Sequence, residues 1–575
     1  MKRYEGPYSA RNGAYGGVDD LGRVLTTDNT IPLPRKNRSV GMFYYLAPGN
    51  HGLRGPYDNN KIVTSHPEAI ESEEAWMAAG GGERHADHHF AEPLFGYYTM
   101  NDAWVVRKHV QMLTDAGVDY LVFDTTNAVT YDGTVKILLG ILDEFYKQGI
   151  TNVPKVAYYT NALSGRTINH IYHNIYRKYP EYGHLWFYWD GRPLIIGHPD
   201  DPELEEEAKA FFRIKISYWP TSRRSSDDQW PWVEFAGIYT PDAVYGVNGR
   251  KEVVSVSSAQ HCDTIFSGSA WYGESNRTKS YRRDLGANDP AEDAVLWGYN
   301  FADQWNWAIE QDPETIFVTQ WNEWLAMRME PMGGHPIAFV DLADPNNSRD
   351  IEPMRGGFGD NYYMQLCELI RRYKGAPPRV DVGGNVTIQI GGTFRQWDSV
   401  PAQYRDYTGD TVPRDKEGFG AYYYKDDSGR NDFALLKAAR DEKNLYFYAQ
   451  TVDPITQPDG GSWMTLFINS GNTENKNWHG FDYVINRIAP GETGAVIEAC
   501  KGGWHWRAIG TAEMRIEENE MMLRVPRDLI GVEEGLLNLQ FKWADNYTEG
   551  DIWSFYEKGD AAPIGRLTYV FREID

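Results

Sequence analysis

The sequence is short of cysteine and of long apolar runs. Its 575 residues include three cysteines, Cys262, Cys367 and Cys500, which are too few and too widely spaced to predict a disulfide framework or a zinc site. No stretch reaches the roughly 18 apolar residues of a membrane span, and the first residues lack the apolar core of a signal peptide. We therefore expect a soluble chain with no membrane partner, cytoplasmic as written, or secreted or periplasmic if a signal peptide has been removed.

Basic residues are also scarce relative to acidic ones. There are 57 Lys and Arg against 81 Asp and Glu, a formal net charge of -24 at pH 7. A surface this acidic repels phosphate backbones, which excludes nucleic acid as an expected partner. Aromatic residues are plentiful at 14% of the chain. Their flat apolar faces and polar edges suit sugar rings, although large cores use the same side chains. Nothing in the sequence predicts an oligomeric state.

Short apolar strands alternate with helical segments between residues 39 and 374. Such alternation predicts a parallel sheet, and its length favours a closed (β/α)8 TIM barrel. No Gly-x-Gly-x-x-Gly follows an early strand, so the dinucleotide-binding version is not expected. The expected strands are 40–47, 118–124, 153–162, 193–197, 211–219, 235–239, 252–258 and 314–320. The expected helices are 103–117, 134–149, 168–179, 294–311 and 362–375.

The pattern changes at 374–384, a stretch that combines paired Pro with paired Gly. Beyond it, short strands separated by turn residues predict an all-β sandwich. We therefore expect an N-terminal extension over 1–38, a barrel catalytic domain over 39–374 and a β-sandwich over 375–575.

Two carboxylates come directly after predicted barrel strands, where TIM barrels carry their chemistry. Asp124 ends the strand at 118–124, and the competing interpretation is a cap for the next helix. Glu323 follows the strand at 314–320 and lies between Trp321 and Trp324, beside Asn322. Indoles exclude water and raise the pKa of a carboxyl group, as a general acid requires. The alternatives for Glu323 are an ion pair with Arg328 or an acid in the first turn of a following helix.

Two carboxylates at separate strand ends are the minimum for glycoside hydrolysis. One protonates the leaving oxygen, and the other attacks the anomeric carbon or activates water. We predict Glu323 as the general acid/base and Asp124 as nucleophile, base or anchor of the sugar at the cleavage point.

A third polar cluster lies between residues 83 and 98 and contains His85, Asp87, His88, His89 and Glu92. It fits a hydrogen-bonding rim for sugar hydroxyls, a metal site or a plain surface loop. The spacing matches no His-Glu-x-x-His motif, and neighbouring His88 and His89 would point opposite ways in a strand, so no metal ligands are assigned. The residues predicted to bind substrate are His88, His89, Glu92, Tyr97, Asn127, Trp271, Arg277, Trp321, Asn322 and Glu352.

Several of these motifs resemble those of glycoside hydrolase families 99 and 71. The stretches "FVTQWNEW" followed by "MEP", "VGMFYYLAP", "MLTDAGVDYLVFDTTN" and "WFYWDGRPLII" carry the resemblance over about 39–374. It implies a TIM-barrel enzyme cutting α-mannosidic or α-glucosidic links, with Glu323 as a catalytic residue. Family 99 has a second glutamate three residues later, where this chain has Ala326. The partner carboxylate must therefore come from elsewhere, and Asp124 is preferred over Glu92 and Glu352.

The C-terminal part resembles family 9-type carbohydrate-binding modules, through "NDFALLKAARDEKNLYFYAQT", "RVPRDLIG", "LQFKWADN" and "GDAAPIGRLTYVF". Such modules clamp sugars between exposed aromatics, and some hold calcium. The resemblance implies Trp463, Trp478 and Trp504 as clamp candidates and allows a structural calcium ion; no other cofactor is expected. Core packing is the competing role for each tryptophan.

The sequence thus predicts a glycoside hydrolase acting on a poly- or oligosaccharide. A metal-dependent hydrolase using the cluster from His85 to Glu92 and a non-catalytic glycan-binding protein are the alternatives. Sugar identity, linkage, endo or exo action and anomeric outcome are open.

Overall fold

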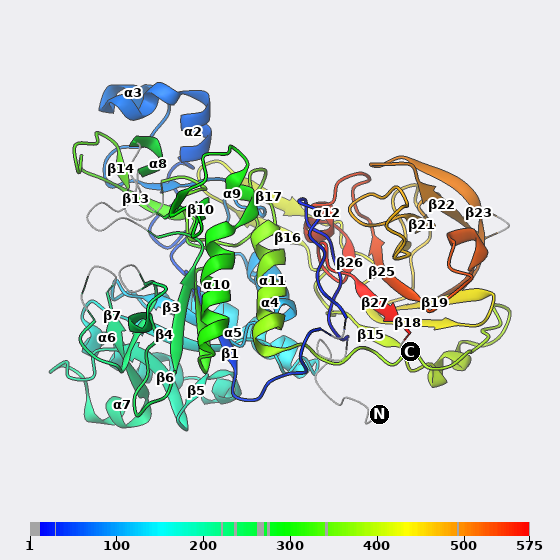
Figure 1. Ribbon diagram of the computed structural model, residues 1–575, viewed down its shortest axis with the longest axis horizontal. Coiled ribbons are helices and arrows are strands. Elements are labelled where there is room, and N and C mark those ends of the chain that lie inside the picture. The colour runs from blue at the N-terminus through cyan, green and yellow to red at the C-terminus, as the bar shows by residue number, and fades with distance from the viewer. Residues whose placement is uncertain are drawn as a thin grey trace.

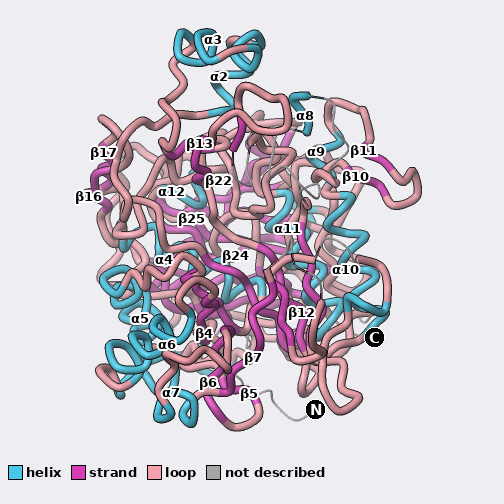
Figure 2. Tube along the Cα trace, turned by 90° about the vertical axis from the view of Figure 1, so that its left-hand side faces the viewer, coloured by secondary structure: helices cyan, strands magenta, loops and turns pink. Residues whose placement is uncertain are grey.

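The computed structural model describes residues 12–28, 30–219, 222, 224–234, 238–260, 269–272, 277–339, 343–491 and 494–573. A barrel and a β-sandwich lie side by side, and helices α2 (Asn59–Ser65) and α3 (Glu73–Ala78) stand above the barrel (Figures 1 and 2). The fold class expected from the sequence, a TIM barrel followed by an all-β sandwich, is confirmed.

In the described part of the chain, eight parallel strands form a nearly closed barrel in the order β8-β7-β6-β4-β3-β1-β12-β9. The strands are β1 (Ser39–Tyr44), β3 (Tyr120–Thr125), β4 (Lys155–Thr160), β6 (Arg192–Gly197), β7 (Arg213–Tyr218), β8 (Gln229–Pro231), β9 (Val253–Ser257) and β12 (Thr315–Thr319). The short strand β5 (Tyr188–Trp189) pairs antiparallel with β6. All six residues of β3 are buried, which explains its nearly continuous apolar sequence.

The barrel helices cover the outside of this sheet. They are α4 (Ala103–Ala116), α5 (Asp132–Lys147), α6 (Ser164–Ile171), α7 (Glu206–Phe211), α9 (Ala294–Trp297), α10 (Tyr299–Gln311) and α11 (Asn361–Lys374). Helix α4 ends where Gly117 adopts a left-handed conformation with φ 90°, the turn that glycine makes at least cost.

Three expected elements differ from the structure. The helix expected at 294–311 is divided into α9 and α10 by Gly298, whose φ is 64°. The helix expected at 168–179 begins earlier, as α6, and continues as a π-helical turn at Tyr172–Tyr176. The strand expected at 235–239 has its first three residues outside the described ranges, and its last two form a turn; β8 supplies the strand at that side of the barrel.

A small cap lies beyond the carboxyl ends of the barrel strands, because the chain passes directly from β12 into it. It contains α2, α3, α8 (Ser269–Tyr272) and an antiparallel sheet in the order β14-β13-β2. The strands of that sheet are β2 (Asp87–His89), β13 (Leu325–Met329) and β14 (Ala338–Phe339). Two further short strands, β10 (Tyr281–Arg282) and β11 (Ala287–Asn288), pair with each other. The cap therefore lies on the side of the barrel where its chemistry is expected.

The sandwich is one antiparallel sheet folded into two layers. Its strands are β15 (Gln403–Arg405), β18 (Phe433–Arg440), β19 (Asn444–Thr451), β20 (Thr465–Asn469), β21 (Tyr483–Ile485), β22 (Ala495–Cys500), β23 (Trp506–Glu517), β24 (Glu520–Pro526), β25 (Asn538–Asp545), β26 (Asp560–Ala562) and β27 (Tyr569–Arg572). The long strand β23 joins the layers, since its first half pairs with β22 and its second half with β24. A short helix, α12 (Ser554–Glu557), precedes β26.

Barrel and sandwich are joined by specific contacts. Tyr407 donates a hydrogen bond to Asp115 of α4 (2.9 Å), and buried Arg414 donates to Asp102 (2.8 Å). The hairpin of β16 (Arg414–Glu417) and β17 (Tyr423–Asp426) reaches the barrel, where the N–H of Phe419 bonds to the carbonyl of Tyr97 (2.9 Å). Within the described ranges, no helix combines the length and hydropathy that crossing a lipid bilayer requires.

Candidate active site

Three neighbouring strands bring the two predicted catalytic carboxylates to one edge of the barrel. β1 lies between β3 and β12, so the end of β1 separates Asp124 from the segment that carries Glu323. The register sets Tyr44 beside Phe123, which places Tyr45 at the level of Asp124. Adjacent strands are about 4.8 Å apart, so the backbones of β3 and β12 are separated by about 10 Å.

Alternation along the strands directs Tyr45 and Asp124 toward the barrel axis. The barrel interior is filled by a cluster that includes Phe43, Val122, Tyr159 and Phe317. Tyr45 is two residues beyond Phe43, and Asp124 is two residues beyond Val122, so both share the inward face. They form the polar layer above an apolar filling, as expected at the catalytic end of a TIM barrel.

The half-buried phenol of Tyr45 lies within electrostatic range of three carboxylates. Burial raises the pKa of Tyr45 well above its usual value, and the negative charges of Glu323, Asp124 and Asp87 raise it further. Carboxylates from the ends of β12 and β3 and from strand β2 of the cap therefore all contribute to the electrostatic surroundings of this hydroxyl. Sequence reasoning missed Tyr45 as a site residue, and it treated Asp87 only as one member of a loop cluster.

The carboxylate of Glu323 is held by hydrogen bonds and remains partly accessible to solvent. Its side chain is 14% exposed, and Oε2 accepts hydrogen bonds from Gln320 and from Nη2 of Arg349 (3.4 Å). Its backbone N–H donates to Asp350 (2.5 Å). Buried Arg349 in turn lies over the ring of Trp232, at 5.0 Å from the centroid. The carboxylate therefore has a fixed orientation at the edge of the barrel mouth.

Both structural alternatives for Glu323 are wrong. Arg328 is fully buried and pairs with Glu73 and the carbonyl of Gly82 instead. The segment after Glu323 is strand β13 rather than a helix, so there is no first turn for it to occupy.

A buried charged layer lies behind Glu323. Burial raises the pKa of Asp350 to about 8, while burial lowers the pKa of Lys279 to about 7. The charges of these two groups attract each other, and Lys279 also donates to the carbonyl (2.7 Å) and hydroxyl (2.5 Å) of Ser348. This layer holds the segment at Ser348–Asp350 against the motif that carries Glu323.

Asp124 does not cap the following helix. Helix α5 begins at Asp132 after Tyr131, whereas Oδ1 of Asp124 accepts from the N–H of Thr126 (2.9 Å). This local turn fixes a carboxylate that is 7% exposed at the strand end. The capping alternative is therefore wrong.

The side chains of Tyr131, Asn127 and His51 form the rim of the barrel mouth next to Asp124. The hydroxyl of Tyr131 accepts from Nδ2 of Asn127 (2.9 Å) and contacts Nε2 of His51 (2.8 Å). Burial raises the pKa of Tyr131 to about 12, with added effects of the Asp124 and Asp87 charges. Asn127 is exposed, so its amide lies within reach of a ligand in the mouth.

Asp87 lies beside the position that departs from the family 99 pattern. Ala326 pairs with His88 across β13 and β2, and the next pair is Met327 with Asp87. Burial raises the pKa of Asp87. A carboxylate thus comes from the strand that neighbours Ala326, although β2 and β13 are far apart in the sequence.

Four of the residues predicted to bind substrate are buried supports. Asn322 clamps the backbone of Tyr45: Oδ1 accepts from its N–H (2.9 Å), and Nδ2 donates to its carbonyl (3.0 Å). Trp321 is fully buried, with its ring against His109 at 5.7 Å between centroids. The ring of the neighbouring Trp324 is also buried and stacks on Phe90 at 4.5 Å. These two indoles fill the core rather than the mouth.

Glu352 and His88 are the other two supports. Glu352 accepts hydrogen bonds from Tyr98 (2.7 Å), the indole of Trp324 (2.5 Å) and Nε2 of His109 (2.9 Å). His88 accepts from the N–H of Gly82 (2.9 Å), so its proton is on Nδ1, and burial lowers its pKa to about 3.

His89, Glu92 and Tyr97 belong to a separate polar network under the β16–β17 hairpin. Lys61 pairs with Glu92 and donates to the hydroxyl of Tyr97 (2.7 Å), which donates to Asp58 (2.7 Å). The buried ring of His89 packs edge-on against Tyr97, with centroids 4.9 Å apart.

Trp271 and Arg277 lie in two other clusters. Trp271 packs against Trp76 and Phe339 of the cap, at 6.1 and 6.0 Å between ring centroids. The guanidinium of Arg277 lies over Tyr281 at 5.4 Å. Residues 273–276, which include the polar loop residues Glu274, Ser275 and Asn276, fall outside the described residues. The roles of all these residues toward a substrate stay predictions.

A pocket extends along the strand ends on the side of β4, β6 and β7. It has a volume of about 440 Å³ and is lined by residues that include Asn161, His198, Ser217 and Trp219. The indole of Trp219 is 36% exposed and lies 6.0 Å from that of Trp232. An exposed indole beside polar groups is a surface on which a sugar ring can stack.

The segment from His85 to Glu92 does not gather metal ligands in the described structure. His88 and His89 lie on opposite faces of β2, as alternation predicts, and exposed His85 pairs with Glu330 (3.5 Å). Among the residues described, the group of carboxylates that could hold an ion lies elsewhere, in the sandwich.

No family model matches the sequence, and no curated protein matches it. Among solved structures, two of the GH99 endo-alpha-mannosidase from Bacteroides thetaiotaomicron are similar, both at 16% identity. One gives a TM-score of 0.34 and covers 59% of this chain and 98% of that one; the other gives 0.32 and covers 50% and 83%.

A family 9 carbohydrate-binding module (CBM9) from Caldicellulosiruptor kristjanssonii, in complex with glucose, is similar at 8% identity and a TM-score of 0.13. It covers 25% of this chain and 69% of that one. The chain thus resembles a family 99 glycoside hydrolase with a family 9-type module, as its motifs indicate. Because the sequence identities and TM-scores are this low, the matches assign no activity to the chain.

Proposed function

We propose that this protein is a glycoside hydrolase that cleaves a poly- or oligosaccharide in the mouth of its barrel. The observation that supports this most strongly is the position of Asp124 and Glu323 at the carboxyl ends of β3 and β12, which are separated by one strand of the barrel. Two carboxylates from separate strand ends, one on each side of a bound sugar, are the arrangement that glycoside hydrolysis requires.

In this proposal Glu323 protonates the leaving glycosidic oxygen. Its side chain is partly exposed, and its Oε2 is held by Gln320 and Arg349, which leaves the group fixed for proton transfer. Asp124 faces the opposite side of the sugar, where it attacks the anomeric carbon or activates the water that does. Tyr45 lies between them, where its hydroxyl can bond to the ring oxygen or to Asp124.

The spacing of the strands bears on the stereochemical outcome. With backbones about 10 Å apart across β1, side chains that lean inward give carboxylate separations in the range of both mechanisms, about 5–5.5 Å for retention and 6.5–9.5 Å for inversion.

The test is a screen of plant and microbial glycans, including α-mannosides and α-glucosides, with product analysis by NMR. Wild-type protein is compared with Glu323→Gln and Asp124→Asn, and with Glu181→Gln as a control at an exposed glutamate remote in sequence from the barrel mouth. We expect hydrolysis by the wild type and the control, and a loss of about 10³-fold or more in each site variant, as for a group that acts in the transition state.

Three results would count against the proposal. Hydrolysis that survives Glu323→Gln would place the chemistry elsewhere. Hydrolysis abolished by a chelator would favour the metal-dependent alternative. Binding of a glycan with no turnover, unchanged in both site variants, would favour a non-catalytic glycan-binding protein.

A further inference from the structure

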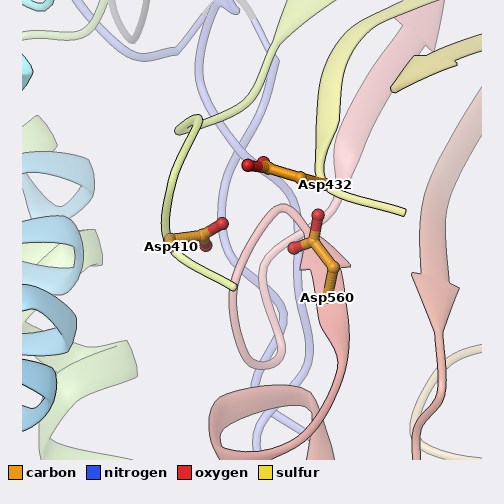
Figure 3. Close-up of side chains that lie close together, drawn as sticks. All are labelled: Asp410, Asp432 and Asp560. Carbon is orange, nitrogen blue, oxygen red and sulfur yellow. The ribbon is translucent and has the colours of Figure 1, made fainter. Parts of the chain in front are cut away.

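Three aspartates of the sandwich point toward one another at its junction with the barrel (Figure 3). Asp410 lies between β15 and β16, Asp432 immediately precedes β18, and Asp560 begins β26. One oxygen of each carboxylate lies within 4.8 Å of the corresponding oxygens of the other two. Segments far apart in the sequence therefore bring three like charges to one point.

Each of these carboxylates has one oxygen bound by the protein and one without a partner. The Oδ2 atoms accept hydrogen bonds, whereas the three Oδ1 atoms are buried and have no hydrogen-bond partner among the described residues. Asp410 and Asp560 are each 3% exposed. The donors to Oδ2 are Gln111 for Asp410 (2.7 Å), the N–H of Gly409 for Asp432 (2.7 Å) and the N–H of Phe433 for Asp560 (2.6 Å). Buried carboxylate oxygens without donors are costly unless a cation neutralises them.

The surrounding charges do not balance the cluster. Asp406 is also buried. The negative charge of Asp406 acts on Asp560, and the negative charge of Asp410 acts on Asp406. Against these four carboxylates stand two lysines: Lys108, whose Nζ is 3.7 Å from Asp410, and fully buried Lys542, whose charge acts on Asp406 and Asp560. With all four carboxylates ionised, the site carries an excess of at least two negative charges.

We propose that Asp410, Asp432 and Asp560 bind one Ca²⁺ ion at the junction of sandwich and barrel. Calcium takes oxygen ligands, carboxylates above all, at about 2.3–2.6 Å and in flexible geometry. Ligands at that bond length on one ion lie at most about 5 Å apart, which matches the spread of these oxygens. A divalent charge offsets the excess of two.

The ion would join the sandwich to the barrel. Asp410 is anchored on helix α4 through Gln111 and Lys108, whereas Asp432 and Asp560 begin strands of the sandwich. Beside Asp410, the backbone of Thr408 bonds to the side chain of Gln148, next to the end of α5 (2.8 Å). Binding therefore holds the starts of β18 and β26 against a segment that docks on two barrel helices.

The test uses the full-length chain after dialysis against EGTA and then against calcium-free buffer. Calorimetric titration with Ca²⁺ and elemental analysis of the loaded protein give the stoichiometry, and thermal unfolding with and without Ca²⁺ gives the shift in Tm. We expect one ion per chain and, at about ten times Kd, a rise in Tm of about 3–6 °C. Mg²⁺ at the same concentration should give a smaller rise.

Variants separate ion binding from ordinary packing. Asp560→Asn and Asp410→Asn should lose the ion and the Tm shift, whereas Asp427→Asn, at an exposed aspartate near Asp432, should keep both. Without calcium, the two site variants should be at least as stable as the calcium-free wild type, because each removes a repelling charge. A role in packing alone predicts the opposite order.

Several outcomes would overturn the assignment. They are a wild type that binds no Ca²⁺, a response to Mg²⁺ that matches or exceeds that to Ca²⁺, and retention of the Tm shift in Asp560→Asn. The wild-type titration decides the matter even where a variant does not fold.

Discussion

Glu352 gives a quantitative test of how the motif around Glu323 is supported. Its fully buried carboxylate accepts three hydrogen bonds, from Tyr98, Trp324 and His109. In Glu352→Ala all three buried donors lose their acceptor. At about 1–3 kcal/mol for each unsatisfied group, the free energy of unfolding should fall by about 6 kcal/mol, with a water molecule in the vacated space reducing the loss.

The matched variant Glu352→Gln keeps the shape of the side chain. Its remaining oxygen can accept from Tyr98 and Trp324, and its amide can donate to Nε2 of His109 if that ring moves its proton to Nδ1. The proton then points to the hydroxyl of Tyr44, which lies 2.8 Å from Nδ1. The three hydrogen bonds remain, but none of them involves a charged group any longer. At about 1 kcal/mol for each bond, the free energy of unfolding should fall by about 3 kcal/mol.

Urea unfolding of both variants, with kcat and KM on the substrate found by the glycan screen, measures these effects. We expect Glu352→Gln to retain KM and to lose less than about tenfold in kcat, since its effect reaches the substrate only through Trp324 and the neighbouring Glu323. Equal costs for the two variants, or a cost below about 1 kcal/mol for Glu352→Ala, would refute the hydrogen-bonding account. A large rise in KM for Glu352→Gln would mean that Glu352 touches the substrate.

Three further predictions concern the same region. Tyr45→Phe should lower kcat by about 100-fold with unchanged stability, because only a hydroxyl between the carboxylates is removed; wild-type kcat would contradict its placement. Asn322→Ala should lower the free energy of unfolding by about 2–4 kcal/mol, since both backbone groups of Tyr45 lose a buried partner; a urea titration with no change would argue against the clamp. His88 stays neutral in the folded state down to a pKa of about 3, while unfolded histidine takes up a proton below about pH 6.5. Below about pH 6.5 the unfolded state therefore binds one proton more than the folded state. Between pH 7 and 5 the free energy of unfolding of the wild type should fall by about 2 kcal/mol more than that of His88→Gln. Parallel pH profiles of stability for the two proteins would contradict this.

The barrel could be predicted from sequence because its strands are buried on both faces and read as apolar runs. The same rule located Asp124 and Glu323, since each directly follows such a run. Tyr45 was missed because an aromatic residue at the end of an aromatic strand has the signature of a core residue. Only the alternation from Phe43, together with the neighbouring carboxylates, identifies it as a residue of the mouth.

Positions that depend on pairing between distant segments could not be predicted. Asp87 lies beside the segment that follows Glu323 because β2 pairs with β13, and Asp410, Asp432 and Asp560 meet because three segments of the sandwich converge. The indoles of Trp321 and Trp324 were expected to shield Glu323, but their rings turn into the core. Local sequence gives the side chains near a site, whereas tertiary packing decides their direction.

We propose that a sugar is cleaved between Glu323 and Asp124. The most direct measurement is a crystal structure of the Glu323→Gln variant with an uncleaved oligosaccharide bound. We expect a glycosidic oxygen within hydrogen-bond distance of the residue 323 side chain, with the anomeric carbon facing Asp124 and the hydroxyl of Tyr45 in contact with the same sugar. An oligosaccharide bound only on the sandwich, or only at the network of Lys61, Glu92 and Tyr97, would contradict it.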